Sequence, residues 1–341
     1  MTRRIPALVV CVAAVIALVV PLFLPDLSFY IQMILAAVIV TGLSLFMGYA
    51  GQASLGHGAF VAVGALTVAV MTVRLGLPPL LALICAPILA AVFAYIVGLP
   101  LLRLRGHYLA FGTLALLLIV QAVIATVPFF GGGLGIFGVP PLGVGDAVIS
   151  GQLPYVYLSL AVLALALLIS RNVIRSRFGR GVRALAGSES AAASSGVPVL
   201  RTKLAVFALS AAFAGLAGGI MAFFTPYVSS ESFPVATSIA YIIMAVIGGL
   251  GSLWGGVIGA VLVSLLVQVL NAVSNQPGLP ATTGPVLQYG AYALVLILAL
   301  LFIPKGIVPT IAQAMRRRRD RRADAAAPTD VAVEPWASVQ G

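Results

Sequence analysis

The chain has 341 residues, of which 62% are apolar and only 8% are Asp, Glu, Lys or Arg, and its mean hydropathy is +1.17. Its 19 basic and 8 acidic side chains are too few to cover a soluble fold of this size, because soluble domains carry about 25% charged residues. This composition excludes a soluble enzyme, a disordered chain and a secreted disulfide scaffold. It predicts an all-α polytopic membrane protein.

Ten apolar runs are long enough to cross a bilayer core of about 30 Å as helices. They cover residues 6–24, 30–48, 58–73, 80–99, 107–127, 154–170, 204–224, 237–249, 254–271 and 286–304. Some are short or interrupted by Gly and Pro, so we expect about ten transmembrane helices within a range of 8–11. Lipid offers no partner to backbone polar groups, so the runs are predicted to be helical and no strand is needed.

The first run, residues 6–24, has a second interpretation as a cleaved signal peptide, because Arg3 and Arg4 precede it. It ends in Pro25 and Asp26 without a small-x-small cleavage site, which favours an uncleaved helix. The two cysteines, Cys11 and Cys85, both lie in apolar runs, so we expect small hydrophobic residues rather than a disulfide or metal ligands.

The basic residues predict the orientation of the bundle. With the N-terminus in the cytoplasm and ten spans, 18 of the 19 basic residues fall on the cytoplasmic side and only Arg74 falls outside. Asp26, Asp146 and Glu231 fall outside as well. This asymmetry predicts that both termini are cytoplasmic. It also accounts for the net charge of +11 without nucleic acid as a partner.

The domain organisation follows from the same count. Residues 1–315 are predicted to form one transmembrane domain, with a long cytoplasmic segment at 171–203 and a Gly- and Pro-rich external segment at 128–153. Residues 316–341 change abruptly to charged residues, Ala and Pro. We expect a disordered basic cytoplasmic tail whose arginines anchor the last helix at anionic membrane lipid, with a dedicated partner-binding role as the alternative.

Catalytic and energy-coupling motifs are missing from the sequence. It contains no phosphate-binding loop, HExxH, CxxC or nucleophile-elbow pattern, so we expect neither an enzyme nor a metal site nor a cofactor. The apolar runs hold no acidic residue at mid-depth, where ion-coupled carriers keep their proton or cation relays. Uphill transport by this chain therefore requires energy from a partner.

The glycine-dense segment 48–59 is the first candidate for function. Its glycines, Gly48, Gly51, Gly56 and Gly58, permit either close helix packing or an unwound backbone beside a cavity. In the unwound case, the polar side chains offered to a substrate pathway are Gln52, Ser54 and His57. The alternative is that these side chains only hydrogen-bond between packed helices.

Two further glycine sets predict close helix packing. Gly251, Gly255 and Gly259 form a G-x-x-x-G-x-x-x-G ridge just after Gly248, and Trp254 is expected at the cytoplasmic interface. A second ridge in the run 204–224 consists of Ala211, Gly215 and Gly219.

The cytoplasmic segment 171–203 predicts two short helices. The first starts near Arg180 and ends at Gly187, while Ser188 caps a second helix that has Glu189 in its first turn and stops at Gly196. Two such helices suit a docking surface for a cytosolic protein. An ordinary basic loop that maintains topology is the alternative.

Several motifs resemble a known family. The pattern formed by Glu189, Ala191, Ala192 and Gly196 resembles the E-A-A-x-x-x-G loop of ABC importer permeases, the segment that engages the ATPase subunit. Residues 48–60 are similar to the G-x-x-G-x-x-S-L-G-H-G-A-F signature of the branched-chain amino acid permeases of that class. Residues 102–110, 135–140, 227–233 and 247–255 are similar to runs typical of the LivM-type members. The matches span about residues 40 to 305 in the expected order.

The resemblance implies a permease subunit of an ABC importer for branched-chain or related hydrophobic amino acids, in the bacterial cytoplasmic (inner) membrane. It implies four kinds of partner: a second permease subunit, two cytosolic ABC ATPase subunits that bind the ATP, a periplasmic or lipid-anchored solute-binding protein, and membrane lipid. The segment 179–197 then transmits ATPase closure. Glu189 and Gly196 set the docking helix, and Arg180 and Arg183 meet acidic groups on the ATPase.

Two other functions remain open from the residues alone. One is a stand-alone channel or facilitator for a small neutral solute such as urea or an amide, with the glycine-rich segments as its pore. The other is a structural subunit of a membrane enzyme complex, with 171–203 as its docking arm. The sequence does not identify the solute.

Overall fold

The computed structural model describes residues 17–22, 26–104, 106–144, 147–149, 151–274, 287, 290, 293–294, 297 and 306–310. Its α-helices are α2 (Ser28–Leu43), α3 (His57–Ala69), α4 (Pro79–Leu101), α5 (His107–Thr126), α6 (Gln152–Arg175), α7 (Arg177–Gly187), α8 (Glu189–Ser194), α9 (Val199–Phe224), α10 (Val235–Gly248) and α11 (Leu253–Ser274). Short π-helical turns, Ser44–Tyr49 and Val70–Arg74, extend α2 and α3.

Eight helices of the described residues are long and apolar enough to cross a membrane. They coincide with the second to the ninth predicted runs, so the expectation of a helical polytopic bundle is confirmed for that part of the chain. The runs 6–24 and 286–304 lie mostly outside the described residues, and the tail 316–341 lies wholly outside them. The total of ten spans and the cytoplasmic position of both termini therefore stay predictions.

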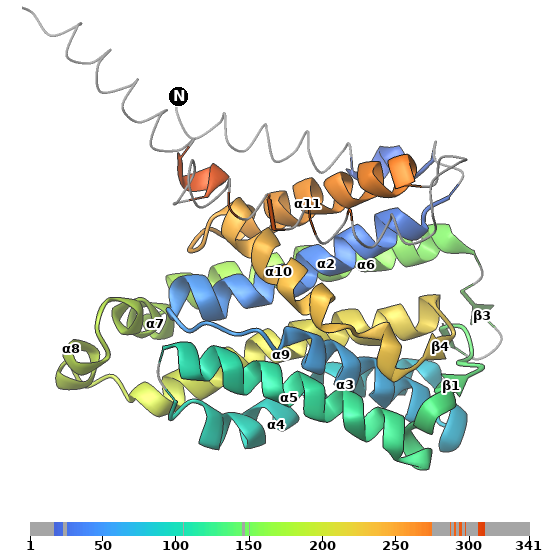
Figure 1. The fold of residues 1–341 in the computed structure, drawn as a ribbon, viewed down its shortest axis with the longest axis horizontal. Helices are drawn as coiled ribbons and strands as arrows, with labels where there is room; N and C mark the ends of the chain where they lie inside the picture. The colour runs from blue at the N-terminus through green and yellow to red at the C-terminus, as the bar shows by residue number, and fades with distance from the viewer. Residues whose placement is uncertain are drawn as a thin grey trace, which may run out of the picture.

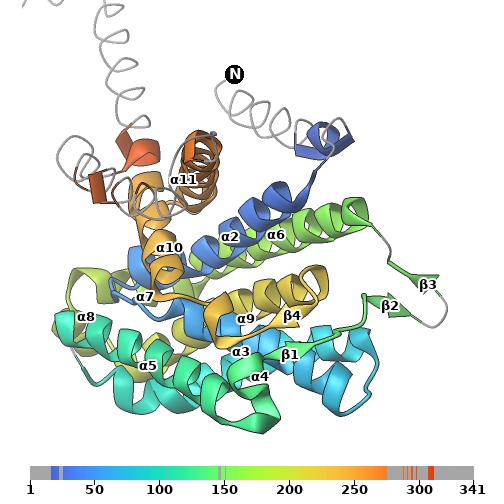
Figure 2. The same ribbon diagram turned by 45° about the vertical axis from the view of Figure 1, so that its right-hand side comes forward.

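The bundle is layered around α9. Helices α3 and α4 pack on one side of α9, with α5 beyond α3. Helices α2 and α6 pack on the other side, and α10 and α11 pack against α2 (Figure 2). The long helices run between two ends, with α7 and α8 at one end and the strands at the other (Figure 1). Because the basic segment and the Gly- and Pro-rich segment lie at opposite ends, the arrangement fits a bundle that crosses a bilayer along its helices.

In the part of the chain that the structure describes, four two-residue strands lie at the end opposite to α7 and α8. Strand β1 (Ile136–Phe137) pairs antiparallel with β4 (Tyr227–Val228), and β2 (Gly143–Val144) pairs with β3 (Ala147–Val148). The sequence predicted no strands. Both pairs form outside the helical spans. The β1–β4 pair joins the segment that precedes α6 to the turn that follows α9, and the β2–β3 pair lies within the segment that precedes α6.

Backbone contacts between small residues hold α9 between α3 and α4. A Cβ atom added to Gly64 of α3 would collide with the carbonyl of Gly215, and one added to Gly218 would collide with the carbonyl of Val61. On the other side, a Cβ at Gly219 would lie 3.0 Å from the Cβ of Ala86 in α4. The predicted ridge of Gly215 and Gly219 thus faces α4, and the helices approach closely because no side chain separates them.

Helices α10 and α11 approach each other in the same way. A Cβ atom added to Gly255 would collide with the Gly248 carbonyl of α10, and one added to Gly259 would collide with the Met244 carbonyl. Gly251 differs from the prediction, because it lies in the turn before α11 at φ +82° rather than on the helical ridge. Its neighbour is Gly48, whose added Cβ would collide with the Gly251 amide.

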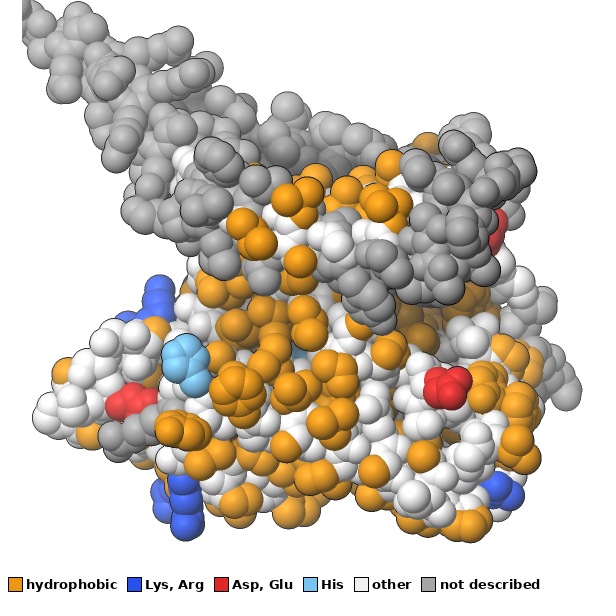
Figure 3. Space-filling view, viewed as in Figure 1, with side chains coloured by type: hydrophobic (Ala, Val, Ile, Leu, Met, Phe, Trp, Pro, Cys, Tyr) orange, Lys and Arg blue, Asp and Glu red, His pale blue; other side chains and the backbone are white. Residues whose placement is uncertain are grey.

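Hydrophobic side chains cover the middle of the bundle surface, and Lys and Arg side chains lie towards its ends (Figure 3). Exposed Ile, Leu, Val and aromatic residues are concentrated on α4, α5 and α11. An apolar belt of this kind is what a lipid-facing surface requires.

Candidate functional site

The segment between α2 and α3 leaves the helical conformation. Residues 50–56 belong to no helix, and α3 begins only at His57. Gly51 has φ +68°, and a Cβ there would lie 3.1 Å from the Cα of Ala186 in α7. Ala50, Ser54 and Gly58 are spaced four residues apart and would share one face of a continuous helix. Because the helix is interrupted, they do not share a face. The structure thus has the unwound form of the two that the glycines permit.

His57 is fully buried at the start of α3. Its Nδ1 hydrogen-bonds the hydroxyl of Ser54 over 3.0 Å, and its Nε2 hydrogen-bonds the hydroxyl of Ser210 in α9. Phe60 packs edge-on against the imidazole, with ring centroids 5.7 Å apart. Ser54 and His57 therefore tie the unwound segment to α9. Their role in a substrate pathway stays a prediction.

Gln52 joins the unwound segment to the cytoplasmic helices. Its Nε2 donates a hydrogen bond to Oε1 of Glu189, 3.2 Å away at the start of α8. The same carboxylate oxygen accepts a charge-assisted hydrogen bond of 2.5 Å from the ammonium of Lys203 in α9. The Lys203 side chain is only 3% exposed and that of Glu189 is 31% exposed. A buried ammonium requires such a partner, so the carboxylate fixes α8 against both α9 and residues 50–56.

Helices α7 and α8 form the segment that the sequence assigned to docking. Helix α7 begins at Arg177, three residues before the expected start, because the Ser176 hydroxyl accepts a hydrogen bond from the Gly179 amide. Ser188 caps α8 as expected, accepting from the Ala191 amide at 3.3 Å. Gly196 follows α8 with φ +80°, a left-handed conformation that favours glycine.

The remaining residues that the sequence predicts for docking differ in exposure. Ala192 is buried, whereas Ala191, Gly196 and Arg180 are exposed. The exposed Arg183 donates through Nε to the Gly179 carbonyl and through Nη2 to the Ile174 carbonyl, so its guanidinium binds the last turn of α6. Contact of Arg180 and Arg183 with an ATPase stays a prediction.

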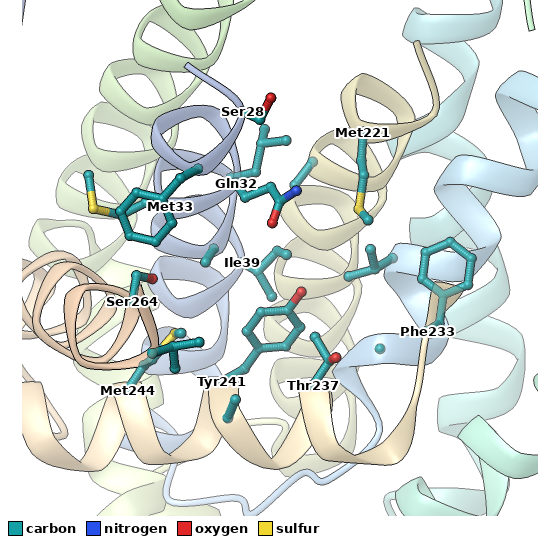
Figure 4. Close-up of a pocket in the computed structure, with 18 of the residues that line it drawn as sticks. Ser28, Gln32, Met33, Ile39, Met221, Phe233, Thr237, Tyr241, Met244 and Ser264 are labelled. Atoms are coloured by element: carbon teal, nitrogen blue, oxygen red, sulfur yellow. The ribbon is translucent and has the colours of Figure 1, made fainter. Parts of the chain in front are cut away.

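A cavity of about 460 Å³ lies between α2, α3, α9, α10 and α11. It extends from Asp26 and Ser28, at the end of the bundle opposite to α7 and α8, to Ile39 and Met244 (Figure 4). Figure 4 shows the side chains of Gln32 and Tyr241 pointing into this space from facing walls. Its volume is typical of a site for a small molecule.

The cavity is bounded by the first turn of α3, which directly follows the unwound segment. Gly58 lines it and donates its backbone N–H to the hydroxyl of Ser238 in α10 at 2.9 Å. Gln52, Ser54 and His57 are not among the lining residues. Sequence reasoning did not single out Gln32, Thr237, Tyr241 or Ser264, because a lone polar residue in an apolar run carries no periodic signal.

Comparisons with known proteins bear on this arrangement. Residues 27–303 match the family model described as the branched-chain amino acid transport system permease component. The chain is 30% identical over 292 residues to the high-affinity branched-chain amino acid transport system permease protein LivM of Escherichia coli, covering 79% of this chain and 66% of that protein. It thus spans slightly less than two thirds of that relative's length.

More distant relatives include a second branched-chain amino acid permease and a permease named for a sugar. The chain is 26% identical to a probable LivM permease of Methanocaldococcus jannaschii over 244 residues, covering 67% of this chain and 68% of the relative. It is 36% identical to the L-arabinose transport system permease protein AraH of Escherichia coli over 132 residues, or 38% of each chain. No solved structure matches the chain significantly.

Proposed function

The chain belongs to the family of branched-chain amino acid transport system permease components, and on that premise we propose that it is a permease subunit of an ABC importer. It acts in the bacterial cytoplasmic membrane with a second permease, two cytosolic ATPases and a solute-binding protein. Its solute is a branched-chain or related hydrophobic amino acid. Residues 1–315 form the transmembrane domain, with about ten spans and both termini cytoplasmic, and residues 316–341 form the basic tail.

One observation carries this proposal. The segment that resembles an ATPase-engaging loop is bonded to the unwound segment that leads to the cavity. Glu189 holds Gln52 at one end of residues 52–58, and Ser238 of α10 holds Gly58 at the other end. A force applied to α8 therefore reaches the wall of the cavity through the seven residues 52–58.

The mechanism that we propose is alternating access. ATP binding draws the two ATPases together, and they displace the segment 179–197. Gln52 moves with Glu189, because Gln52 donates a hydrogen bond to the same Glu189 carboxylate oxygen that binds Lys203. The shift of residues 50–56 moves the start of α3. Because Gly58 is hydrogen-bonded to Ser238, it also moves the first turn of α10. Helix α10 carries Thr237 and Tyr241, so the cavity changes shape.

Reconstitution tests the proposal. The tagged chain is purified from a host that co-expresses the neighbouring permease, ATPase and binding-protein genes, and it is placed in liposomes with enclosed or external ATP. We expect the ATPases to co-purify and L-leucine uptake to require ATP and the binding protein. Uptake at full rate by the chain alone, without any ATPase, would contradict the proposal and support a stand-alone channel.

A further inference from the structure

We propose that the cavity between α2, α10 and α11 is a solute site for zwitterions that carry an apolar side chain, and that its own lining contributes to selectivity. The inference rests on the proposed function, because it gives the transported solute a place in this chain. It assigns the site to residues of α2, α3, α9, α10 and α11 rather than to the polar side chains of the glycine-rich motif. Three properties of the lining support this site: its charge, its hydrogen-bonding groups and its apolar surface.

The lining carries almost no net charge. Among the lining residues that the structure describes, Asp26 is the one carboxylate and no Lys, Arg or His is present. Asp26 is exposed and precedes α2, where a hydrogen bond from the Ser28 backbone N–H lowers the pKa of its carboxyl group. An anionic solute finds no cation here, and a cationic solute finds a carboxylate only at one end of the cavity. A solute of zero net charge suits such a wall.

The polar groups deeper in the cavity are amides and hydroxyls. Each can both donate and accept a hydrogen bond, and four of them come from three different helices: Gln32 of α2, Thr237 and Tyr241 of α10, and Ser264 of α11. Tyr241 and Ser264 are each 8% exposed. Groups of mixed donor and acceptor character can solvate an ammonium and a carboxylate together, without leaving a buried charge when the solute departs.

The apolar part of the wall favours a flexible aliphatic group. Met33, Met221 and Met244 line the cavity from α2, α9 and α10, and Ile39 and Val61 add aliphatic surface. Thioether side chains are unbranched and polarizable, so they adapt to apolar groups of different shape. The wall thus suits a range of aliphatic side chains rather than one.

The same wall disfavours a sugar. A pentose carries hydroxyl groups around its whole ring, so some of them would face Met33, Met244 or Ile39 without a hydrogen-bond partner. Each unpaired hydroxyl costs roughly tenfold or more in affinity. This distinction is informative because the chain is partly similar to an L-arabinose permease.

Cysteine protection tests the site. In a background with Cys11→Ser and Cys85→Ser, the variants Thr237→Cys and Ser264→Cys are reacted, in the full complex in liposomes, with a membrane-impermeant methanethiosulfonate. We expect both thiols to react, and a saturating concentration of L-leucine to slow the reaction about tenfold. L-Arabinose, L-glutamate and L-lysine should leave the rate unchanged. The matched control is Ser159→Cys, because Ser159 is buried in α6 and does not line the cavity.

The outcomes separate the site from the proposed function. If L-leucine gives no protection while the same vesicles take it up with ATP, the site is elsewhere and the function stands. If L-arabinose protects as well as L-leucine, the selectivity argument is wrong. If L-leucine protects the thiols in vesicles whose uptake does not depend on ATP, the result would support the site and contradict the proposal of an ABC importer.

A second variant guards against a thiol that disturbs the fold. Met244→Trp fills the inner end of the cavity, so we expect L-leucine uptake to fall at least tenfold while the complex assembles and hydrolyses ATP. Met244→Leu keeps a similar volume and apolar surface, so uptake should fall much less than in Met244→Trp. Wild-type uptake by Met244→Trp would contradict the proposal.

Discussion

Gln52 donates a hydrogen bond to the carboxylate of Glu189 over 3.2 Å, although 137 residues separate the two in the sequence. One residue belongs to the glycine-rich motif and the other to the loop that resembles an ATPase-docking segment. Their contact makes a single connected unit of two motifs that the sequence offers separately. It also gives Gln52 a task distinct from the substrate contact that the motif alone suggests.

We predict that Gln52→Leu uncouples ATP hydrolysis from transport. The substitution removes a hydrogen bond to a charged group, worth about 1.5–3 kcal/mol, and leaves α8 and its ion pair in place. Uptake per ATP hydrolysed should fall about tenfold or more in proteoliposomes. Ser194→Ala is a suitable control, because Ser194 is exposed on α8 and bonds only within that helix. Normal coupling in Gln52→Leu would show that the contact transmits nothing.

The ion pair between Lys203 and Glu189 predicts an asymmetric pair of variants. Glu189→Gln leaves the buried ammonium without a carboxylate and should cost about 3 kcal/mol or more of stability. Lys203→Met leaves a partly exposed carboxylate that keeps Gln52, so the loss should be smaller. Thermal unfolding of the purified complex measures both. The double variant should be more stable than Glu189→Gln alone, and a purely additive result would contradict a direct pair.

Gly196 and Gly187 form a matched pair around α8. Both have open space where a Cβ would lie, but only Gly196 has a positive φ, of +80°. Gly196→Ala should therefore cost about 1–2 kcal/mol and weaken coupling, while Gly187→Ala should be neutral. Gly196→Trp should abolish substrate-dependent transport. Wild-type uptake by Gly196→Trp would remove the docking role from this segment.

The close approach of α3 and α9 predicts a large effect from one methyl group. Gly64→Ala places a Cβ against the Gly215 carbonyl, a backbone atom that cannot move alone. Overpacking of this kind typically costs about 1–3 kcal/mol, so the melting temperature of the complex should fall. Gly181→Ala in α7 meets only the Val197 side chain at 3.4 Å and should leave the melting temperature unchanged or higher.

Charge asymmetry predicts the topology of the termini. In the cysteine-free background, a cysteine at Gly341 should be protected from an impermeant thiol reagent in spheroplasts. A cysteine at Gly133, in the segment before α6, should react at once. Reaction at residue 341 only after permeabilisation supports a cytoplasmic C-terminus and an odd number of spans after residue 133, as the ten-span topology requires. Reaction in intact spheroplasts would place the C-terminus outside and contradict that topology.

Much of the helical framework could be predicted from local signals. The apolar runs located the eight spans of the described residues to within a few residues, because lipid forces each run into a helix. Ser188 and Gly196 marked the ends of α8 through capping chemistry that acts over three or four residues. The start of α7 was missed by three residues, since Ser176 was not recognised as its cap.

The connections between distant segments could not be predicted. Lys203 counts as one more basic residue in a cytoplasmic loop, and only the fold shows that it is buried against Glu189. Gly251 continues a four-residue spacing, yet the turn at Gly249 removes it from the helix. The cavity side chains come from helices far apart in sequence, so their convergence depends on packing that no short pattern encodes.

The near absence of charge from the described wall of the cavity has an electrical consequence. A membrane potential does about 2.3 kcal/mol of work on each elementary charge per 100 mV. A zwitterion that passes groups such as Gln32, Thr237 and Tyr241 moves no net charge, and Asp26 lies before the first turn of α2. Under the proposed function the transport step is then electrically silent, so we expect the solute gradient to depend on ATP turnover alone and not to change when an ionophore collapses the voltage.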